Sequence, residues 1–491
     1  MKRIFIIALL LSSYFSNAQN TMLNAEFWKK NPDVSAVKSE IANGNSPSEA
    51  NRGNHDVTSM AINSGAPMET IIYLLNQDGN AVDKTTHDGR LYIHWAANKG
   101  NVDLVKYLIS KGSEINRTDD KGATPLAFAA SNGQVNKDIY ETFFQNGLDV
   151  KYKNANGATF MHMVIGYDKD LALTDYLISK GLKLTDVDAN GNTVFDYAAR
   201  TGNVDILKQL QKRGIKPTDK ALIFASEGTR SNANNIEFYK YLVEDLKLKP
   251  KTTGDNSENV LHNLVKKQDQ QEIVTYFLAK GVDVNQANKE GNTVLMEAAK
   301  GTDVEMLKTV LSKTKNINQR NNNGMSALSF AVNNGTADIV STLITEKADI
   351  QVRDNSGNII TYYLIQSYRP LRPNQKDEFS NKISVLETSG VDFKELQKDG
   401  NSILHLAVSK NDLKLLKKLE KYDINVNAVN EEMMTPLHKA ALIAKDNIIL
   451  KYLVDKGADI TLRTEFDETA YDLASENEVL QKNAINIDFL K

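Results

Sequence analysis

A turn residue that recurs at a nearly constant interval constrains the fold of this chain more than any other feature. Gly89, Gly122, Gly157 and Gly191 are spaced 33, 35 and 34 residues apart. The same phase continues at Ser257, Gly291, Gly324, Gly357, Gly400, Met433 and Asp467. A fixed period of this length predicts a solenoid, in which each repeat buries its apolar face against its neighbours. About thirteen units, including a degenerate one near 54–86 and the two ends, account for almost the whole chain.

A second recurring segment supports this period. The hexapeptide YLISKG stands at Tyr107–Gly112 and again at Tyr176–Gly181, 69 residues later, and related versions stand at Tyr276–Gly281 and Tyr452–Gly457. The unit Asp88–Asn116 contains two short apolar segments separated by a Gly-Asn turn, and the hexapeptide ends the second segment. Each unit is therefore predicted to form a helix, a turn, a second helix and a second turn.

Residues at fixed positions within the units carry a family resemblance. Thr435–His438 opens one unit as Thr-Pro-Leu-His, followed by the small pair Ala440-Ala441 and the ending Lys456–Ala458. Thr124–Leu126 with Ala129-Ala130 repeats the pattern. In this respect the chain resembles the ankyrin repeat family over roughly residues 54–480. The resemblance implies an all-α ankyrin-repeat solenoid of stacked helix-turn-helix units with short β-turn or hairpin connections.

The recurring proline, alanine and glycine residues suit helix ends and helix packing for physical reasons. Proline suits the first helical turn, where its missing N–H would have no partner, and the threonine before it can cap exposed amides. Paired alanines remove side-chain volume where neighbouring helices stack about 8–10 Å apart. Gly112 and Gly281 follow second helices, at a position that favours the left-handed conformation.

The N-terminal segment departs from the repeat. Lys2 and Arg3 precede an apolar run from Ile4 to Leu11, and Ser16–Ala18 supplies the small residues that a signal peptidase requires. We therefore expect a cleaved signal peptide at 1–18, in preference to a buried N-terminal helix, and a protein that is periplasmic or secreted. No later stretch approaches about 20 apolar residues, so we expect no membrane insertion after cleavage.

Charge and cysteine content exclude several classes of function. Removal of residues 1–18 takes away two positive charges and moves the formal net charge from -3 to -5. A chain of this charge has no electrostatic reason to bind nucleic acid. The absence of cysteine excludes disulfides and thiolate metal sites.

The mature chain is expected to consist of one array between two ends. An N-terminal cap at 19–53 has apolar residues at helical spacing, and we interpret Trp28 there as core. Two stretches of the array are irregular. Residues 218–253 lack the turn glycine, and an insertion near 366–378 contains Pro370 and Pro373. The insertion is interpreted as a projecting loop that serves as a hinge, a contact site or nothing beyond tolerated loop growth. The expected divisions are 54–253, 254–394 and 395–491.

No catalytic or metal-binding constellation is apparent. Five histidines occupy one repeat position, where the resemblance implies bonding to turn backbone: His94, His162, His262, His405 and His438. Neighbouring repeats would hold them about 10 Å apart, too far to share a zinc ion. His55 and His87 have no clustered partners in the sequence, and Asp168 and Asp170 are expected to be solvated in a turn. We predict neither an enzyme nor a cofactor.

Aromatic residues also recur at one repeat position. They are interpreted as core rather than contact surface, because apolar residues at a fixed phase usually bury. The aromatic series is Trp95, Phe128, Tyr197, Phe330 and Tyr363.

In ankyrin arrays the partner usually lies along the concave side, which the turn tips and first helices form. The resemblance therefore implies a protein-binding surface that is polar and rich in asparagine. Its expected residues are Asp120, Lys121, Ser131, Asn132, Arg200, Thr201, Lys289, Glu290, Asn292, Asn322, Asn323, Met325, Lys398, Asp399, Asn401, Glu431 and Glu432.

The function expected from these observations is a non-enzymatic scaffold that acts outside the cytoplasm, as a monomer, and binds another protein along an extended curved face. The alternative is a secreted effector, or a periplasmic accessory factor serving an enzyme such as an oxidative-stress enzyme.

Overall fold

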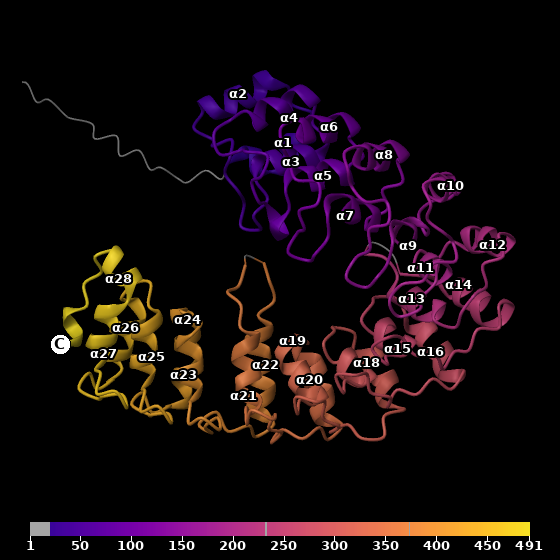
Figure 1. Cartoon of the computed structure of the whole chain (residues 1–491). Coiled ribbons are helices and arrows are strands. Elements are labelled where there is room, and N and C mark those ends of the chain that lie inside the picture. Colours follow the sequence, from indigo (N-terminus) through magenta and orange to yellow (C-terminus); the bar gives the residue numbers. More distant parts are fainter. Residues whose placement is uncertain (1–19, 231–232, 373) are drawn as a thin grey trace, which may run out of the picture. The chain divides into compact units, whose positions relative to one another are not determined.

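The computed structural model describes residues 20–230, 233–372 and 374–491, so the expected signal peptide at 1–18 and Pro373 lie outside the described residues. Within that part, 28 α-helices follow one another, and β-structure is limited to isolated bridges. The prediction of an all-α solenoid is therefore confirmed. The chain divides into two compact units, the first ending at Asn234 and the second running from Asn235 to Lys491 (Figure 1).

The first unit contains thirteen of these helices, each short and separated from the next by a turn. They are α1 (Ala25–Trp28), α2 (Val34–Ala42), α3 (Val57–Ser64), α4 (Met68–Leu75), α5 (Tyr92–Asn98), α6 (Val102–Ser110), α7 (Pro125–Ser131), α8 (Lys137–Gln145), α9 (Phe160–Val164), α10 (Ala172–Ser179), α11 (Val194–Ala199), α12 (Val204–Lys212) and α13 (Ala221–Glu227).

The second unit continues the alternation. Its helices are α14 (Ile236–Lys240), α15 (Val260–Leu264), α16 (Gln271–Ala279), α17 (Val294–Ala298), α18 (Val304–Leu311), α19 (Ala327–Asn334), α20 (Ala337–Thr345), α21 (Ile360–Ser367), α22 (Glu378–Thr388), α23 (Ile403–Val408), α24 (Leu413–Leu419), α25 (Pro436–Ile443), α26 (Ile448–Asp455), α27 (Ala470–Glu476) and α28 (Glu478–Lys482).

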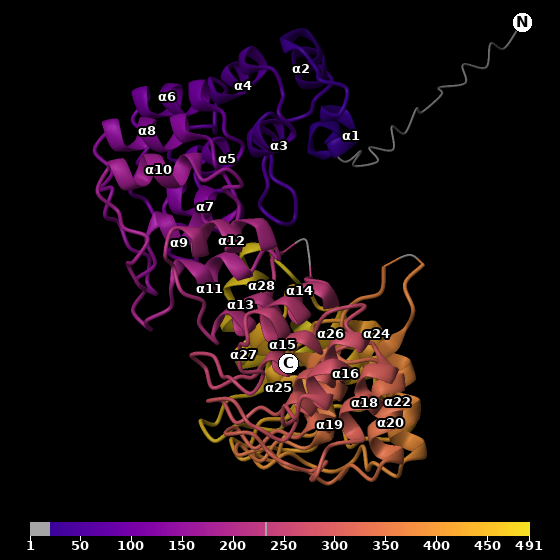
Figure 2. The ribbon, with the colours of Figure 1, turned by 90° about the vertical axis from the view of Figure 1, so that its right-hand side faces the viewer.

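Odd-numbered and even-numbered helices form two layers within each unit. In the first unit α5 packs on α7 and α6 on α8, and in the second α19 packs on α21 and α20 on α22 (Figures 1 and 2). Ala96, Ala97, Ala129 and Ala130 are fully buried between the odd-numbered helices. This confirms that the alanine pairs allow close stacking of the first helix of each repeat.

The helix ends follow the expected capping chemistry. Pro125 and Pro436 stand in the first turns of α7 and α25, and the Thr435 hydroxyl accepts a hydrogen bond from the His438 N–H at 3.3 Å. Gly112 and Gly281 have φ of +89° and +80°, which is the left-handed conformation predicted for a residue after the helix.

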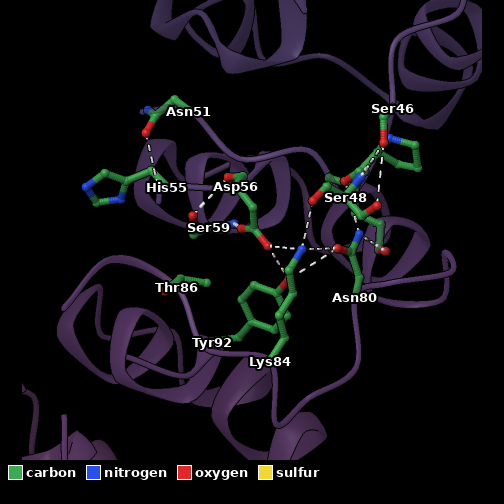
Figure 3. A network of polar contacts seen from close by, with 12 residues as sticks. Ser46, Ser48, Asn51, His55, Asp56, Ser59, Asn80, Lys84, Thr86 and Tyr92 are labelled. Carbon is green, nitrogen blue, oxygen red and sulfur yellow. Dashed lines mark hydrogen bonds and ion pairs between the residues drawn. The ribbon is translucent and has the colours of Figure 1, made fainter. Parts of the chain in front are cut away.

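A buried polar network ties the first repeat to the connection that follows it. The Asp56 carboxylate, 1% exposed, accepts a hydrogen bond from the Tyr92 hydroxyl at 2.5 Å and pairs with Lys84 Nζ at 2.7 Å (Figure 3). Lys84 also donates to the backbone oxygen of Ser48 at 2.9 Å and to Asn80 Oδ1 at 3.1 Å. These contacts fix a long connection that has few apolar residues of its own.

The predicted N-terminal cap segment forms two helices that cover the first repeat. Trp28 on α1 is 2% exposed and donates its indole N–H to the Met22 carbonyl at 2.7 Å, while Val37 on α2 is fully buried. The interpretation of Trp28 as core is confirmed.

Both predicted irregularities are visible in the helix pattern. In the repeat at 218–253, α14 continues into a π-helical turn at Tyr241–Asp245, and the boundary between the two compact units falls within this repeat. In the second unit the connection between α21 and α22 extends beyond the ends of the neighbouring helices (Figure 1). The insertion is therefore a projecting loop.

Candidate protein-binding surface

In many repeats an Asp or Asn side chain shapes the turn that precedes the first helix. Asp119 Oδ1 accepts the backbone N–H groups of Lys121 and Ala123 at 3.0 and 2.9 Å, and Asn321 Oδ1 accepts those of Asn323 and Met325 at the same distances. The side chain thereby replaces backbone partners within the turn. The two residues that follow it are turned outward at the tip.

Several pairs of successive tips are joined by backbone hydrogen bonds. The Asn322 N–H donates to the Glu290 carbonyl at 3.0 Å, and the Asn355 N–H donates to the Asn323 carbonyl at 2.9 Å. In the first unit, Asp120 N–H donates to the Asp88 carbonyl at 2.9 Å. We call the row of exposed tip residues in each unit its tip strip. Where the backbone connects two tips in this way, it fixes the spacing of their side chains.

Twelve of the predicted binding residues are exposed, and all but two of them lie on the tips. Ser131 and Asn132 lie at the C-terminal end of α7. The exposed set is Asp120, Lys121, Ser131, Asn132, Lys289, Glu290, Asn322, Asn323, Lys398, Asp399, Glu431 and Glu432.

Two predicted binding residues are buried, and the prediction for them is corrected. Asn292 and Asn401 are each 4% exposed. Asn292 Oδ1 accepts a hydrogen bond from Asn321 Nδ2 at 2.8 Å, and Asn401 Oδ1 accepts one from Asn430 Nδ2 at 3.2 Å. Both side chains join one repeat to the next and contribute no exposed surface.

Three further predicted residues are half-buried. Arg200 pairs with Glu227 and stacks over the rings of Tyr197 and Phe224, at 5.6 and 4.8 Å from their centroids. Thr201 donates to the Gly166 carbonyl at 2.9 Å, and Met325 is half-buried beside its turn. Arg200 and Thr201 thus connect neighbouring repeats of the first unit.

Two exposed apolar residues on the last tips were not among the predicted binding residues. Phe466 is 77% exposed and Met433 is 49% exposed. They lie beside Glu432 and Glu465, whose tips are joined by a hydrogen bond from the Glu465 N–H to the Glu432 carbonyl at 3.3 Å. The repeat register could have predicted the exposure of Phe466, because it places this residue at the same tip position as Glu432.

The recurring aromatic residues are only partly core. Trp95 and Tyr363 are 6% and 4% exposed, as predicted, whereas Phe128, Tyr197 and Phe330 are half-buried. A cation covers each half-buried ring. The Arg90 guanidinium lies 4.2 Å from the Phe128 centroid, Arg200 lies over Tyr197, and Lys300 Nζ lies 4.5 Å from the Phe330 centroid.

The five histidines at the shared position bond turn backbone, which confirms the expectation for them. In each repeat, Nδ1 accepts the N–H of the residue at the helix start, and Nε2 lies within hydrogen-bond distance of a carbonyl in the following turn. For His405 these partners are the Ser402 N–H at 3.0 Å and the Met434 carbonyl at 2.9 Å. Burial lowers the pKa of His94 and of His405 to about 4, so both imidazoles are neutral at pH 7.

The prediction that His55 and His87 have no clustered partners was wrong. Their rings stack with centroids 4.3 Å apart, next to Trp95.

The prediction of two solvated carboxylates in one turn holds for Asp170, which is exposed, and is wrong for Asp168. Asp168 is 3% exposed and accepts hydrogen bonds from the Thr174 N–H at 2.6 Å and the Thr174 hydroxyl at 2.7 Å. Asp168 therefore caps α10 and has no place at the surface.

Two other features are absent from the described residues. No three His, Asp or Glu side chains gather there in a way that could hold a metal ion. Nor does any helix in that part of the chain combine the length and the apolar character needed to cross a membrane.

Two layers of stacked helix pairs with projecting, linked tips define a repeat solenoid that presents an extended surface to other proteins. The chain belongs to the ankyrin repeat family. Family models for ankyrin repeats match residues 58–154, 136–221, 222–321 and 261–354 as three-copy arrays, 419–474 as a many-copy array and 399–431 as a single repeat. Ankyrin repeats bind other proteins and are in general a non-enzymatic scaffold.

Two relatives are similar in sequence to only part of this chain. Palmitoyltransferase AKR1 of Lachancea kluyveri is 32% identical over 135 residues, which is 26% of this chain and 18% of that protein. Putative palmitoyltransferase ZDHHC13 of Danio rerio is 31% identical over 109 residues, 22% of this chain and 16% of that protein. This chain therefore spans less than a fifth of the length of either relative.

Two solved structures align with part of this chain. The ankyrin repeat domain of Bcl-3 aligns with a TM-score of 0.35 at 19% identity, and covers 47% of this chain and 100% of that chain. The complex of the Bd0816 predatory endopeptidase of Bdellovibrio bacteriovorus with immunity protein Bd3460 contains a chain that aligns with a TM-score of 0.34 at 23% identity. This alignment covers 42% of this chain and 98% of the chain in that complex.

Proposed function

We propose that this chain is a non-enzymatic scaffold that binds another protein through its tip strips and acts outside the cytoplasm. The observation that carries the proposal is the row of exposed side chains on tips that the backbone holds in register. Lys289, Glu290 and Asn323 are examples, and all three are exposed. A row of this kind suits many hydrogen bonds over a wide area.

The last tips of the second unit suggest the character of the partner there. Glu431, Glu432 and Glu465 are exposed on the same two tips as the exposed side chains of Met433 and Phe466. An aromatic anchor within a charged rim is a common arrangement at the centre of protein interfaces. The matching surface of the partner is basic and offers an apolar pocket for Phe466.

Action outside the cytoplasm rests on the sequence of residues 1–18, which has the charged, apolar and small-residue regions of a signal peptide. We further propose that the chain acts as a monomer and meets a periplasmic or secreted partner. If the partner is itself an enzyme, the chain is an accessory factor of that enzyme.

The test is capture of partners from the envelope and the culture medium of the source cells on the immobilised mature chain, followed by measurement of the affinity of each partner. The variant Lys289→Ala, Glu290→Ala, Asn323→Ala should bind a partner of the tip strip with about tenfold lower affinity. The control variant Glu305→Ala, Lys308→Ala removes an exposed ion pair from the outer helix α18 of the same repeat.

Each result has a clear meaning. Weaker binding by the tip variant and unchanged binding by the α18 variant would support the tip strip. Equal affinities for the original chain and the tip variant would refute a binding surface at these repeats.

A further inference from the structure

The projecting loop between α21 and α22 forms a surface separate from the tip strip. The tip at 354–358 precedes α21, and the loop follows α21 at its other end. α21 has eight residues, so about 12 Å of helix separates the two. In the second unit the loop and the tips point in opposite directions (Figure 1).

The base of the loop is anchored, which argues against a hinge. Tyr368 is 6% exposed, donates its hydroxyl to Asp412 Oδ2 at 2.8 Å and packs edge-on against Phe379, with centroids 5.0 Å apart. On the other side of the loop, Lys418 Nζ pairs with Asp377 Oδ2 at 2.8 Å. The loop is thus held at both ends by neighbouring helices of the second unit.

The exposed part of the loop combines cations with an apolar side chain. Arg369 and Arg372 are exposed, and Leu371 between them is 52% exposed. Lys410, on the turn of the following repeat, shares an acceptor residue with Arg369. Arg369 Nη1 donates to the Gln366 carbonyl at 2.8 Å, and Lys410 Nζ donates to Gln366 Oε1 at 3.1 Å.

The positive charge of this group is not neutralised within the described residues. Arg369, Arg372 and Lys410 form no ion pair there. Among the carboxylates at the base of the loop, two pair with other lysines and the third accepts a hydrogen bond from a hydroxyl. Glu378 pairs with Lys376 at 2.9 Å, and Asp377 and Asp412 make the contacts given above. Burial and the charge of Arg369 lower the pKa of Lys410, as expected where cations gather.

We propose that Arg369, Leu371, Arg372 and Lys410 form a docking site for an acidic segment of a partner protein. Carboxylates of the segment pair with the two guanidinium groups, whose planar donors match them. An apolar side chain between the carboxylates covers Leu371. Such a site gives the chain two separate interaction surfaces, the tip strip and this loop.

The experiment measures binding of the full mature chain to a fluorescein-labelled peptide of repeated Glu-Glu-Leu triplets, by fluorescence anisotropy at low salt. The variant Arg369→Ala, Arg372→Ala should bind about tenfold more weakly, and Leu371→Ser about threefold more weakly. A matched control, Lys313→Ala, Lys315→Ala, removes the same charge from exposed lysines elsewhere in the second unit and should leave the affinity unchanged. Circular dichroism confirms that each variant is folded.

Two further probes sharpen the result. A peptide of Lys-Lys-Leu triplets should bind the charge-reversed variant Arg369→Glu, Arg372→Glu more tightly than the original chain, because the acidic tips are the same in both proteins. Vesicles containing anionic lipid should show no loop-dependent binding.

Several outcomes would overturn the proposal. They are equal loss of affinity in the lysine control, retention of the Glu-Glu-Leu peptide by the charge-reversed variant, and loop-dependent binding of the vesicles in place of the peptide. None of these outcomes bears on the tip strip, because the loop variants leave Lys289, Glu290 and Asn323 intact.

Discussion

A buried neutral imidazole joins one repeat to the next at five places in this chain. His438, for example, accepts the Thr435 N–H on Nδ1 at 3.1 Å, and its Nε2 lies 3.0 Å from the Leu462 carbonyl of the following turn. Burial is the main cause of the lowered pKa of all five side chains. A protonated ring could no longer accept through Nδ1, so acid would break the bond to the start of its own helix, while Nε2 could still donate to the following turn.

This arrangement predicts a loss of stability in mild acid. The pKa of His94 and His405 falls from 6.5 in the unfolded chain to about 4 in the folded protein. Between these values the unfolded chain binds more protons than the folded protein. The contribution of each histidine to the free energy of unfolding is therefore complete above pH 6.5 and decreases as the pH falls towards 4. The limit is about 3 kcal/mol for each of these two histidines.

Denaturant unfolding across this pH range measures the effect. The variant His405→Gln should be less stable at pH 7.5 and should show a shallower dependence on pH than the original chain. Parallel profiles for the two proteins would mean that His405 does not contribute to the acid sensitivity.

The buried Asp56–Lys84 pair makes a second prediction at the level of single residues. The variant Lys84→Met leaves a carboxylate that is 1% exposed without its cation, which should destabilise the first repeat by about 3–5 kcal/mol. Hydrogen exchange at α3 and α5 reports this loss. Replacement of the exposed Lys38, on α2, by methionine is the control and should change exchange little. The double variant Asp56→Asn, Lys84→Met should recover part of the stability, and no recovery would contradict the account.

At the scale of the structural element, the tip glycines serve two separate requirements. Gly157 and Gly191 both have φ of +76°, so each needs the left-handed conformation that glycine tolerates best. At Gly157 the next tip is also close, because an added Cβ would lie 2.7 Å from the Ala189 nitrogen. At Gly191 an added Cβ would meet nothing within 4 Å.

These two positions form a matched pair of substitutions. Gly191→Ala should lower the free energy of unfolding by about 1 kcal/mol, which is the cost of the backbone conformation alone. Gly157→Ala should cost a further 1–3 kcal/mol or so, since the clash separates two joined tips. Equal losses in denaturant unfolding would show that the tips are free to move apart.

Element by element, the sequence was informative where the pattern is local. The starts of α7 and α25 follow from Thr-Pro, and the helix ends before Gly112 and Gly281 follow from the glycines. The burial of Asp168 could not be predicted in this way. Its acceptor role depends on Thr174 in the next helix and on the left-handed Leu171, with φ of +59°, between them.

At the scale of the whole molecule, the exposed Phe466 tests whether the last tips belong to the binding surface. Phe466→Ser should lower the affinity for a partner of the tip strip about tenfold. It should leave the free energy of unfolding unchanged, because the side chain is 77% exposed. The measurement is partner affinity by calorimetry or biosensor. Ile178→Ser, which removes a 39% exposed side chain from α10 in the first unit, is the control. An unaltered affinity for the Phe466 variant would place the partner elsewhere.

The sequence by itself determined the period, the class of fold and the two places where the array is irregular. These features could be predicted because each repeat presents the same local pattern, and a residue's position within the repeat largely sets whether it faces a neighbouring helix or the tip. The exposure of Lys289, Glu290 and Asn323 followed from their places at the tips.

Only the tertiary structure decided which side chains meet across repeats. Asn292 and Asn401 stand on tips as the pattern predicts, yet the tips that follow bring Asn321 and Asn430 over them and bury them. The stacking of His55 on His87 is likewise a contact between separate turns. The physical reason is that burial of a tip side chain depends on the packing of the next repeat, where one amide or ring finds a partner far away in sequence.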